Sequence, residues 1–352
     1  MLDSEIGKIN IEDIANSSYS FFALDSEGYL RYNGRVVAIL AGDKDFYSPS
    51  ILLETSSLDS QGDDQKAITN LNSFLAHELA LKLTPIFNLK TADKLSVKAQ
   101  EIADLLLQNY GVVKRSLVTQ KLQELDQFDR AILRQLGVRF GRFHVYMPNI
   151  LKPGCIKILM MLFALQNNNI HKDMGEAVVE QMLRGKTTME QNDNIEDIYY
   201  RLAGYDLWNN YAIRVDITER LANYVQHALN WRTGIEPKAE GAYNGCYFFI
   251  TPHILSILGV GYDVAAKIFR ALGYVSNNTL YDAELAKDAV QIKPLNDDDP
   301  VTMDLWTFVN NKAKLLKQHK IRDKTKVKVK AKPVTINYDS PFSVLLKLKK
   351  EL

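Results

Sequence analysis

The chain has 352 residues, of which 46% are hydrophobic and 24% charged, with a net charge of +1. This composition is ordinary for a soluble globular protein of two or three domains. Two distant cysteines, Cys155 and Cys246, exclude a disulfide framework or a zinc site made from them alone, and they favour a reducing, cytoplasmic setting. The acidic N-terminus lacks an apolar signal core, and the most apolar run, residues 156–165, is shorter than the roughly 20 residues that cross a bilayer.

The first 165 residues predict a small β unit followed by a helical domain. Residues 19–40 contain β-rich runs with turn signals at 25–28 and at Asn33-Gly34, which predicts three antiparallel strands within a unit over residues 1–60. The domain over residues 61–165 is predicted from apolar residues at helical spacing, with Asp126 as the N-cap of one helix. Its expected helices cover residues 62–83, 95–106, 115–122, 127–136 and a stretch after Pro153.

Residues 137–148 predict one strand with a β-bulge inside the helical domain. The alternation of apolar and polar residues slips once, at Gly141, and a glycine tolerates the unusual backbone of an inserted residue. A bulge there would return the apolar residues to one face. The opposite face would then carry Arg139, Arg142, His144 and Tyr146.

The second half predicts a polar linker and then a helix-turn-helix-like module. Residues 166–195 are rich in Asn, Lys and Glu and are expected to be mainly linker, with a helix near 176–183. Within the module, residues 196–280, Asp216 and Glu219 match a capping box at the start of a helix. Thr251-Pro252 opens the first of two short helices, which meet at residues 259–261 with the spacing of a helix-turn-helix. Other expected elements are a helix over 194–207, strands at 212–215 and 247–250, and a loop over 234–245.

Residues 281–352 predict a loop, a basic tail and a terminal amphipathic helix over 340–352. The predicted fold class is therefore mainly α with small β elements. It comprises a small N-terminal antiparallel β unit, a helical domain, the helix-turn-helix-like module and the tail.

No motif in the sequence supports catalysis. The run from Gly185 to Thr188 resembles the end of a phosphate-binding loop, but Glu180 occupies the position of the required earlier glycine. Three aspartates at 297–299 have no partnering acid or histidine at useful spacing, and a solvated loop explains them. The six histidines are dispersed, and HExxH and GxSxG are missing. We expect no catalytic residue, no metal site and no cofactor.

Basic residues supply the candidate nucleic-acid contacts. Residues 312–332 hold ten Lys or Arg against one Asp, and such a tail can neutralise several phosphates, although a disordered solubilising tail explains it equally well. The cationic strand face combines positive charges with an aromatic ring, that of Tyr146, which could stack on a base. The competing interpretation of this face is a surface or interdomain contact. The predicted nucleic-acid-binding residues are Arg139, Arg142, His144, Tyr146, Lys152, Lys267, Arg270, Lys324, Lys326, Lys328, Lys330 and Lys332.

Five stretches, in order along the chain, resemble the C-terminal region of bacterial DExH-box helicases related to the mitochondrial degradosome RNA helicase. They are FALDSEGYLRYNG (22–34), LGVRFGRFHVYMPNILKP (136–153), AIRVDITERL (212–221), ITPHILSILG with AKIFRALGY (250–259 and 266–274), and DSPFSVLLKLK (339–349). Members of this family carry two RecA-like motor domains upstream. This sequence has no Walker A motif, DExH box or QxxGRxGR arginine-finger motif, so the resemblance implies a nucleic-acid-handling region without its motor.

The resemblance and the basic residues together predict a non-catalytic region that binds RNA or DNA non-specifically and acts with a separately encoded helicase motor. One alternative is a protein-interaction scaffold that docks a helicase or nuclease. Another is the inactive remnant of a split helicase gene. No membrane partner is expected.

Overall fold

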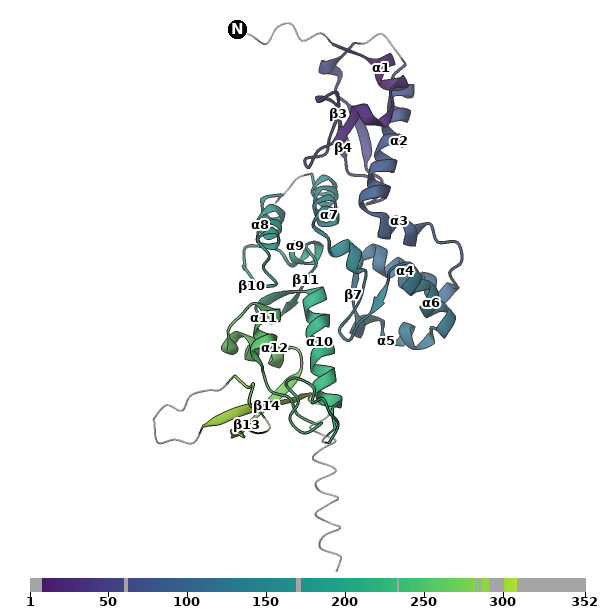
Figure 1. The fold of residues 1–352 in the computed structure, drawn as a ribbon. Coiled ribbons are helices and arrows are strands. Elements are labelled where there is room, and N and C mark those ends of the chain that lie inside the picture. Colours follow the sequence, from purple (N-terminus) through teal and green to yellow (C-terminus); the bar gives the residue numbers. More distant parts are fainter. Residues whose placement is uncertain are drawn as a thin grey trace, which may run out of the picture.

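The protein is a mainly α-helical structure with several small sheets, as the sequence predicts. The computed structural model describes residues 8–59, 63–168, 172–232, 234–282, 284, 286–290 and 301–308. The predicted basic tail and terminal helix lie outside these residues. Figure 1 shows the N-terminal sheet with α1 and α2 at one end of an elongated molecule and α10 to α12 with β13 and β14 at the other. Among the described residues, no helix is both long and apolar enough to cross a membrane.

The N-terminal unit contains the predicted antiparallel strands and one more. Asn33 and Gly34 have positive φ angles of 47° and 82° and form the tight turn that joins two of these strands. The sheet has the order β2-β3-β4-β5, and its last strand was not predicted. Its strands are β2 (Phe22–Leu24), β3 (Tyr29–Tyr32), β4 (Arg35–Ala41) and β5 (Ser50–Leu53). The unit also contains β1 (Ile9–Asn10), α1 (Ile11–Asn16) and β6 (Leu58–Asp59), which lie outside this sheet. Strands β1 and β6 pair in parallel.

The helical body contains the predicted helices in order, with the predicted Asp126 cap, and adds an unpredicted helix at 84–90 and an unpredicted strand at 112–114. Asp63, Ser96 and Asp126 each accept a backbone N–H from the first turn of their own helix. One hydrophobic cluster extends from Ile9 to Leu202, so the N-terminal sheet and these helices share a core. The elements are α2 (Asp64–Lys82), α3 (Thr84–Lys90), α4 (Val97–Gln108), β7 (Val112–Lys114), α5 (Arg115–Glu124), α6 (Gln127–Gln135), β8 (Arg139–Phe140), β9 (His144–Tyr146) and α7 (Pro153–Gln166).

The segment predicted to be mainly linker, residues 166–195, contains the helix expected near 176–183, but that helix is longer than predicted and packs into the protein. Val178 and Met182 lie one helical turn apart and are buried, so the otherwise polar helix packs on α7 through a narrow apolar stripe. A strand after this helix joins a three-stranded sheet of order β10-β12-β11. The elements are α8 (Lys172–Leu183), β10 (Thr188–Glu190), α9 (Asp197–Leu202), β11 (Tyr205–Trp208) and β12 (Tyr211–Arg214). The helix predicted over 194–207 therefore ends early, and its last residues form β11.

The C-terminal module contains the predicted helix-turn-helix. Thr251 caps α11 through its side chain, and Gly259 ends that helix in the left-handed conformation with φ 68°. Residues 274–280, for which no strand was predicted, pair antiparallel with residues 302–308 of the predicted loop and tail. The strand predicted at 247–250 is reduced to isolated bridges at Phe248. The elements are α10 (Val215–Asn230), α11 (Pro252–Leu258), α12 (Tyr262–Ala271), β13 (Tyr274–Leu280) and β14 (Thr302–Phe308). A second hydrophobic cluster, which contains the fully buried Trp306, forms the core of this module.

Helix α2 offers a matched test of the core. Leu71 is 0% exposed and Leu81 is 60% exposed on the same helix. We expect Leu71→Ala to lower the free energy of unfolding by about 2–5 kcal/mol, because it removes buried methyl groups and leaves a cavity. Leu81→Ala should change it by less than about 0.5 kcal/mol. Urea denaturation of both variants checks this, and equal losses would contradict the packing described here.

Candidate nucleic-acid interface

The segment predicted as one bulged strand is a tight β-hairpin. Strands β8 and β9 pair antiparallel, with Arg139 opposite Tyr146 and Phe140 opposite Val145. The N–H of Gly141 donates to the carbonyl of His144 at 2.8 Å and closes the turn. The bulge prediction is therefore wrong: the pattern slips at Gly141 because the chain reverses there.

The hairpin turn is held by one buried carboxylate, that of Glu219 on α10, which is only 3% exposed. Its oxygens accept the backbone N–H groups of Arg142, Phe143 and His144 at 2.6, 2.9 and 2.8 Å, and His144 Nδ1 lies 3.0 Å away. A Cβ added at Gly141 would lie less than 3.0 Å from both carboxylate oxygens, so the glycine is required by this close approach.

The capping box predicted at the start of α10 does not form. The helix begins at Val215, one residue before the predicted cap, and no side chain caps it. Asp216 lies inside the first turn and pairs with Arg214 at 2.5 Å. The Glu219 carboxylate is therefore not used within its own helix and binds the hairpin.

His144 was predicted on a surface face, but it is fully buried. Its Nε2 lies 2.9 Å from Asp206 Oδ2 on β11, and Asp206 also pairs with Lys114 Nζ at 2.9 Å. Burial by itself would lower the pKa of His144, but its hydrogen bonds to Asp206 and Glu219 and their negative charges outweigh burial and raise it. The shared face predicted for Arg139, Arg142, His144 and Tyr146 is therefore wrong, because His144 points into the protein.

Three arginines surround a polar hollow of about 320 Å³ beside the hairpin, here called the arginine hollow. Arg139 and Tyr146 come from paired positions of β8 and β9, Arg142 from the turn, and Arg134 from the end of α6. The hollow is lined by Arg134, Arg139, Phe140, Gly141, Arg142, Tyr146, Pro148, Glu219 and Asn223. Burial, together with the charges of Glu219 and Asp216, raises the pKa of Tyr146, so its hydroxyl stays protonated at neutral pH.

The three arginines are not equivalent. Arg142 is half-buried: its Nη1 donates to Gln226 Oε1 at 2.6 Å, and its guanidinium lies 4.8 Å from the centre of the Phe308 ring. These contacts agree with the interdomain interpretation of this residue. Arg139 is exposed, and Arg134 is exposed and stacks over Phe140 at 5.5 Å. Within the described ranges, no acidic side chain forms an ion pair with any of the three.

Lys152 lines a second hollow, of about 330 Å³. Gln135 and Asn149 of this hollow directly follow Arg134 and Pro148 of the arginine hollow in the chain. The second hollow also contains Lys82, Asn88 and Asn149. The predicted contacts Lys267 and Arg270 are exposed on α12 and line neither hollow, and Arg270 lies 5.5 Å from the Trp306 ring centre. The predicted contacts at 324, 326, 328, 330 and 332 lie outside the described residues.

Sequence reasoning missed Arg134 and its neighbour Arg130, whose guanidinium lies 5.7 Å from the Phe140 ring centre. The signal was present, since the two arginines are spaced i and i+4 on the helix just before the hairpin. This spacing indicates a contact with the hairpin only when the helix is known to pack beside it, and that packing is part of the tertiary structure.

The comparisons with known proteins identify no relative. No family model, no curated protein and no solved structure matches this chain. Among the residues that the structure describes, no group of three or more His, Cys, Asp or Glu is placed to hold a metal ion. The arrangement of the chain's own residues is therefore the basis for proposing a function.

The contact between Gly141 and Glu219 predicts that Gly141→Ala will lower the free energy of unfolding by about 1–3 kcal/mol, since the added methyl must displace a buried carboxylate. Gly154→Ala is the control, because a Cβ there meets no atom within 4 Å and lies in a helix. Chemical denaturation measures both. A Gly141→Ala variant as stable as the control would show that the carboxylate does not hold the turn.

Proposed function

We propose that the protein is a non-catalytic nucleic-acid-binding region of helicase type, which binds RNA or DNA without sequence preference and acts with a separately encoded helicase motor. The observation that carries this proposal is the arginine hollow, with Arg134, Arg139 and Arg142 around one concavity. The resemblance of five stretches to helicase C-terminal regions motivates the motor partner. The cytoplasmic setting rests on the two free cysteines.

The chemistry of the hollow suits a phosphate backbone. Guanidinium groups are always charged and bind phosphate oxygens in pairs of hydrogen bonds, and the side chains of Arg134 and Arg139 are exposed and without an ion pair in the described part of the chain. The nearby Glu219 carboxylate forms no ion pair with Arg134 or Arg139 among the described residues, because its oxygens accept hydrogen bonds from the turn and from His144. Lys152 in the second hollow adds an exposed cation, whereas Lys82 there pairs with Glu78 at 3.4 Å.

The double variant Arg134→Gln with Arg139→Gln tests this proposal. We expect its affinity for labelled single-stranded RNA to fall on the order of tenfold at about 100 mM salt, and the slope of log affinity against log salt to flatten by about 1.4 for two lost phosphate contacts. Fluorescence anisotropy across a salt series measures both quantities.

The matched control removes two positive charges elsewhere, with Lys94→Gln and Lys186→Gln, which are exposed, lie outside the helices and strands, and form no ion pair with any described residue. It should leave affinity and slope near the wild-type values, and thermal unfolding should confirm that both proteins are folded. Failure of the wild type to bind single- or double-stranded RNA or DNA even at about 50 mM salt, where phosphate contacts are strongest, would overturn the proposal.

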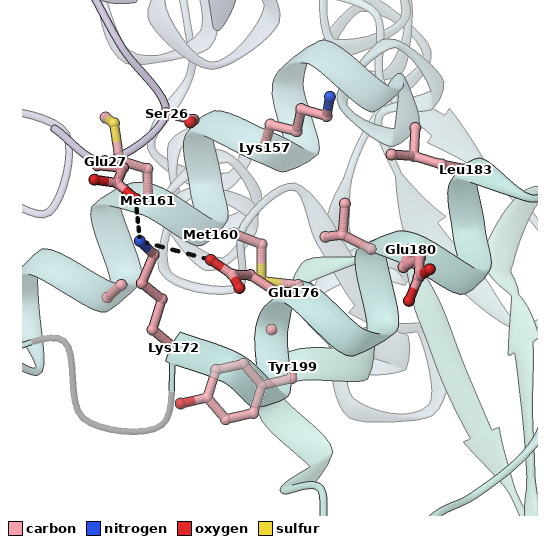
Figure 2. Close-up of a pocket in the computed structure, with 13 residues that line it drawn as sticks. Ser26, Glu27, Lys157, Met160, Met161, Lys172, Glu176, Glu180, Leu183 and Tyr199 are labelled. Atoms are coloured by element: carbon pink, nitrogen blue, oxygen red, sulfur yellow. Dashed lines mark hydrogen bonds and ion pairs between the residues drawn. The ribbon is translucent and has the colours of Figure 1, made fainter.

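An apolar hollow of about 310 Å³ favours a second candidate function, that of a scaffold for a helicase motor. Figure 2 shows it between α7, α8 and the β2–β3 turn, with Met160 and Met161 on its floor. Lys172 closes one end by pairing with Glu27 and Glu176. Lys157 on the rim has no ion pair with any described residue. The occupant that fits is a helix of the motor with one apolar face, because flexible methionine side chains adapt to such faces. A carboxylate of that helix would lie beside Lys157.

The substitutions Val179→Asp with Leu183→Asp place charges in this hollow. We expect them to abolish retention of a helicase motor, identified by mass spectrometry, in a nuclease-treated pull-down. The control Val97→Asp changes a valine that is 80% exposed on another helix. Equal retention of the motor by both variants would exclude this hollow as its docking site.

A further inference from the structure

We propose that the buried His144 makes the joint between the helical body and the C-terminal module sensitive to pH. In its protonated form the imidazole holds the β8–β9 turn against α10, and loss of the proton releases the turn. This inference does not depend on nucleic-acid binding. It rests on the arrangement of His144, Asp206 and Glu219.

Both ring nitrogens of His144 face a carboxylate. Nδ1 lies 3.0 Å from Glu219 Oε1 and Nε2 lies 2.9 Å from Asp206 Oδ2. Only the protonated ring has an N–H on each nitrogen. In the neutral ring one nitrogen would direct a lone pair at a carboxylate oxygen at this distance, which is repulsive. A neutral ring would need one of the two carboxyl groups to carry the proton instead, and the lowered pKa of Asp206 favours the imidazolium.

The charges of the cluster balance only in that state. Lys114 and protonated His144 carry two positive charges against the two carboxylates, and loss of the His144 proton leaves a net charge of −1 on these four groups. The ring and both carboxylates are buried, whereas the Lys114 side chain is 43% exposed. Other charged or titratable groups lie near the ring but form no ion pair with either carboxylate among the described residues. Arg115 on α5 donates to the Gly141 carbonyl, and a small cavity beside the ring is lined by Tyr110, Lys114, Arg201, Tyr205 and Asp206.

The cluster lies where three hydrophobic clusters meet. Val145 of β9 belongs to the core of the helical body, Phe143 packs on the core of the C-terminal module, and Tyr205 of β11 belongs to the third cluster, around α8 and α9. Glu219 lies on α10, between Ile217 and Leu221 of the module core. Loosening the hydrogen bonds of His144 therefore loosens the attachment of one packed unit to another.

The sign of the pH effect follows from two opposite shifts. The pKa of His144 is raised, so its stabilisation is complete below the ordinary value of about 6.5 and is lost as pH rises through the raised pKa. The pKa of Asp206 is lowered: burial opposes this, but the His144 and Lys114 hydrogen bonds and charges prevail. Its contribution is lost only as pH falls through that lowered value. The joint is therefore tightest in mildly acidic solution and loosens towards alkaline pH.

Hydrogen–deuterium exchange of the backbone N–H groups of residues 142–144 tests the inference, at about pH 6 and about pH 8.5 with correction for intrinsic exchange rates. In the wild type the equilibrium constant for local opening should rise by up to about tenfold per pH unit, over the range between the ordinary and the raised pKa of His144. His144→Gln should show no such rise. The control His227→Gln, an exposed histidine on α10, should behave as the wild type does.

Nitrogen NMR of histidine-labelled wild type gives a second readout that does not depend on a folded variant. We expect His144 to keep two ring N–H groups at about pH 7.5, above the ordinary histidine pKa of about 6.5. A neutral His144 ring at that pH, or protection of residues 142–144 that does not change with pH, would overturn the proposal.

Discussion

The carboxylate of Glu219 is the interaction on which the rest of the structure depends. It accepts three consecutive backbone N–H groups of the β8–β9 turn and contacts the His144 ring. A buried carboxylate is costly unless its oxygens are satisfied, and this one is satisfied almost entirely by backbone. Since backbone donors cannot be relocated, the position of α10 and the path of the turn specify each other.

The arginine hollow is a consequence of that constraint. Fixing the turn places Arg139 and Tyr146 at paired positions of the hairpin and brings Arg142 between the hairpin and β14. Arg134 reaches the same concavity because α6 packs its arginines over Phe140. The backbones that present these cations are thus held in a helix and a hairpin, and such preorganisation lowers the entropic cost of binding an anion.

The cluster around His144 contains residue types that are familiar in catalysis, yet its arrangement supports a structural role. A general base needs a free ring nitrogen within reach of a substrate, and both nitrogens of His144 are engaged by carboxylates in the protein interior. Lys114 completes the cluster and also lies 5.1 Å from the centre of the Trp208 ring, which ties β7 to β11. Two charge pairs therefore join strands from different parts of the chain.

The sequence by itself determined the local elements. The Asn33-Gly34 turn, the Asp126 cap and the Thr251-Pro252 helix start were all correctly predicted, because each depends on residues within one turn of the chain. Only the tertiary structure decided where polar side chains go. Gly141 predicts a bulge and Glu219 a cap when only sequence neighbours are considered, whereas the two residues, separated by 78 positions, are in contact. His144 lies among arginines in the sequence but is buried, because its partners Asp206 and Glu219 come from strands and helices that only folding brings beside it.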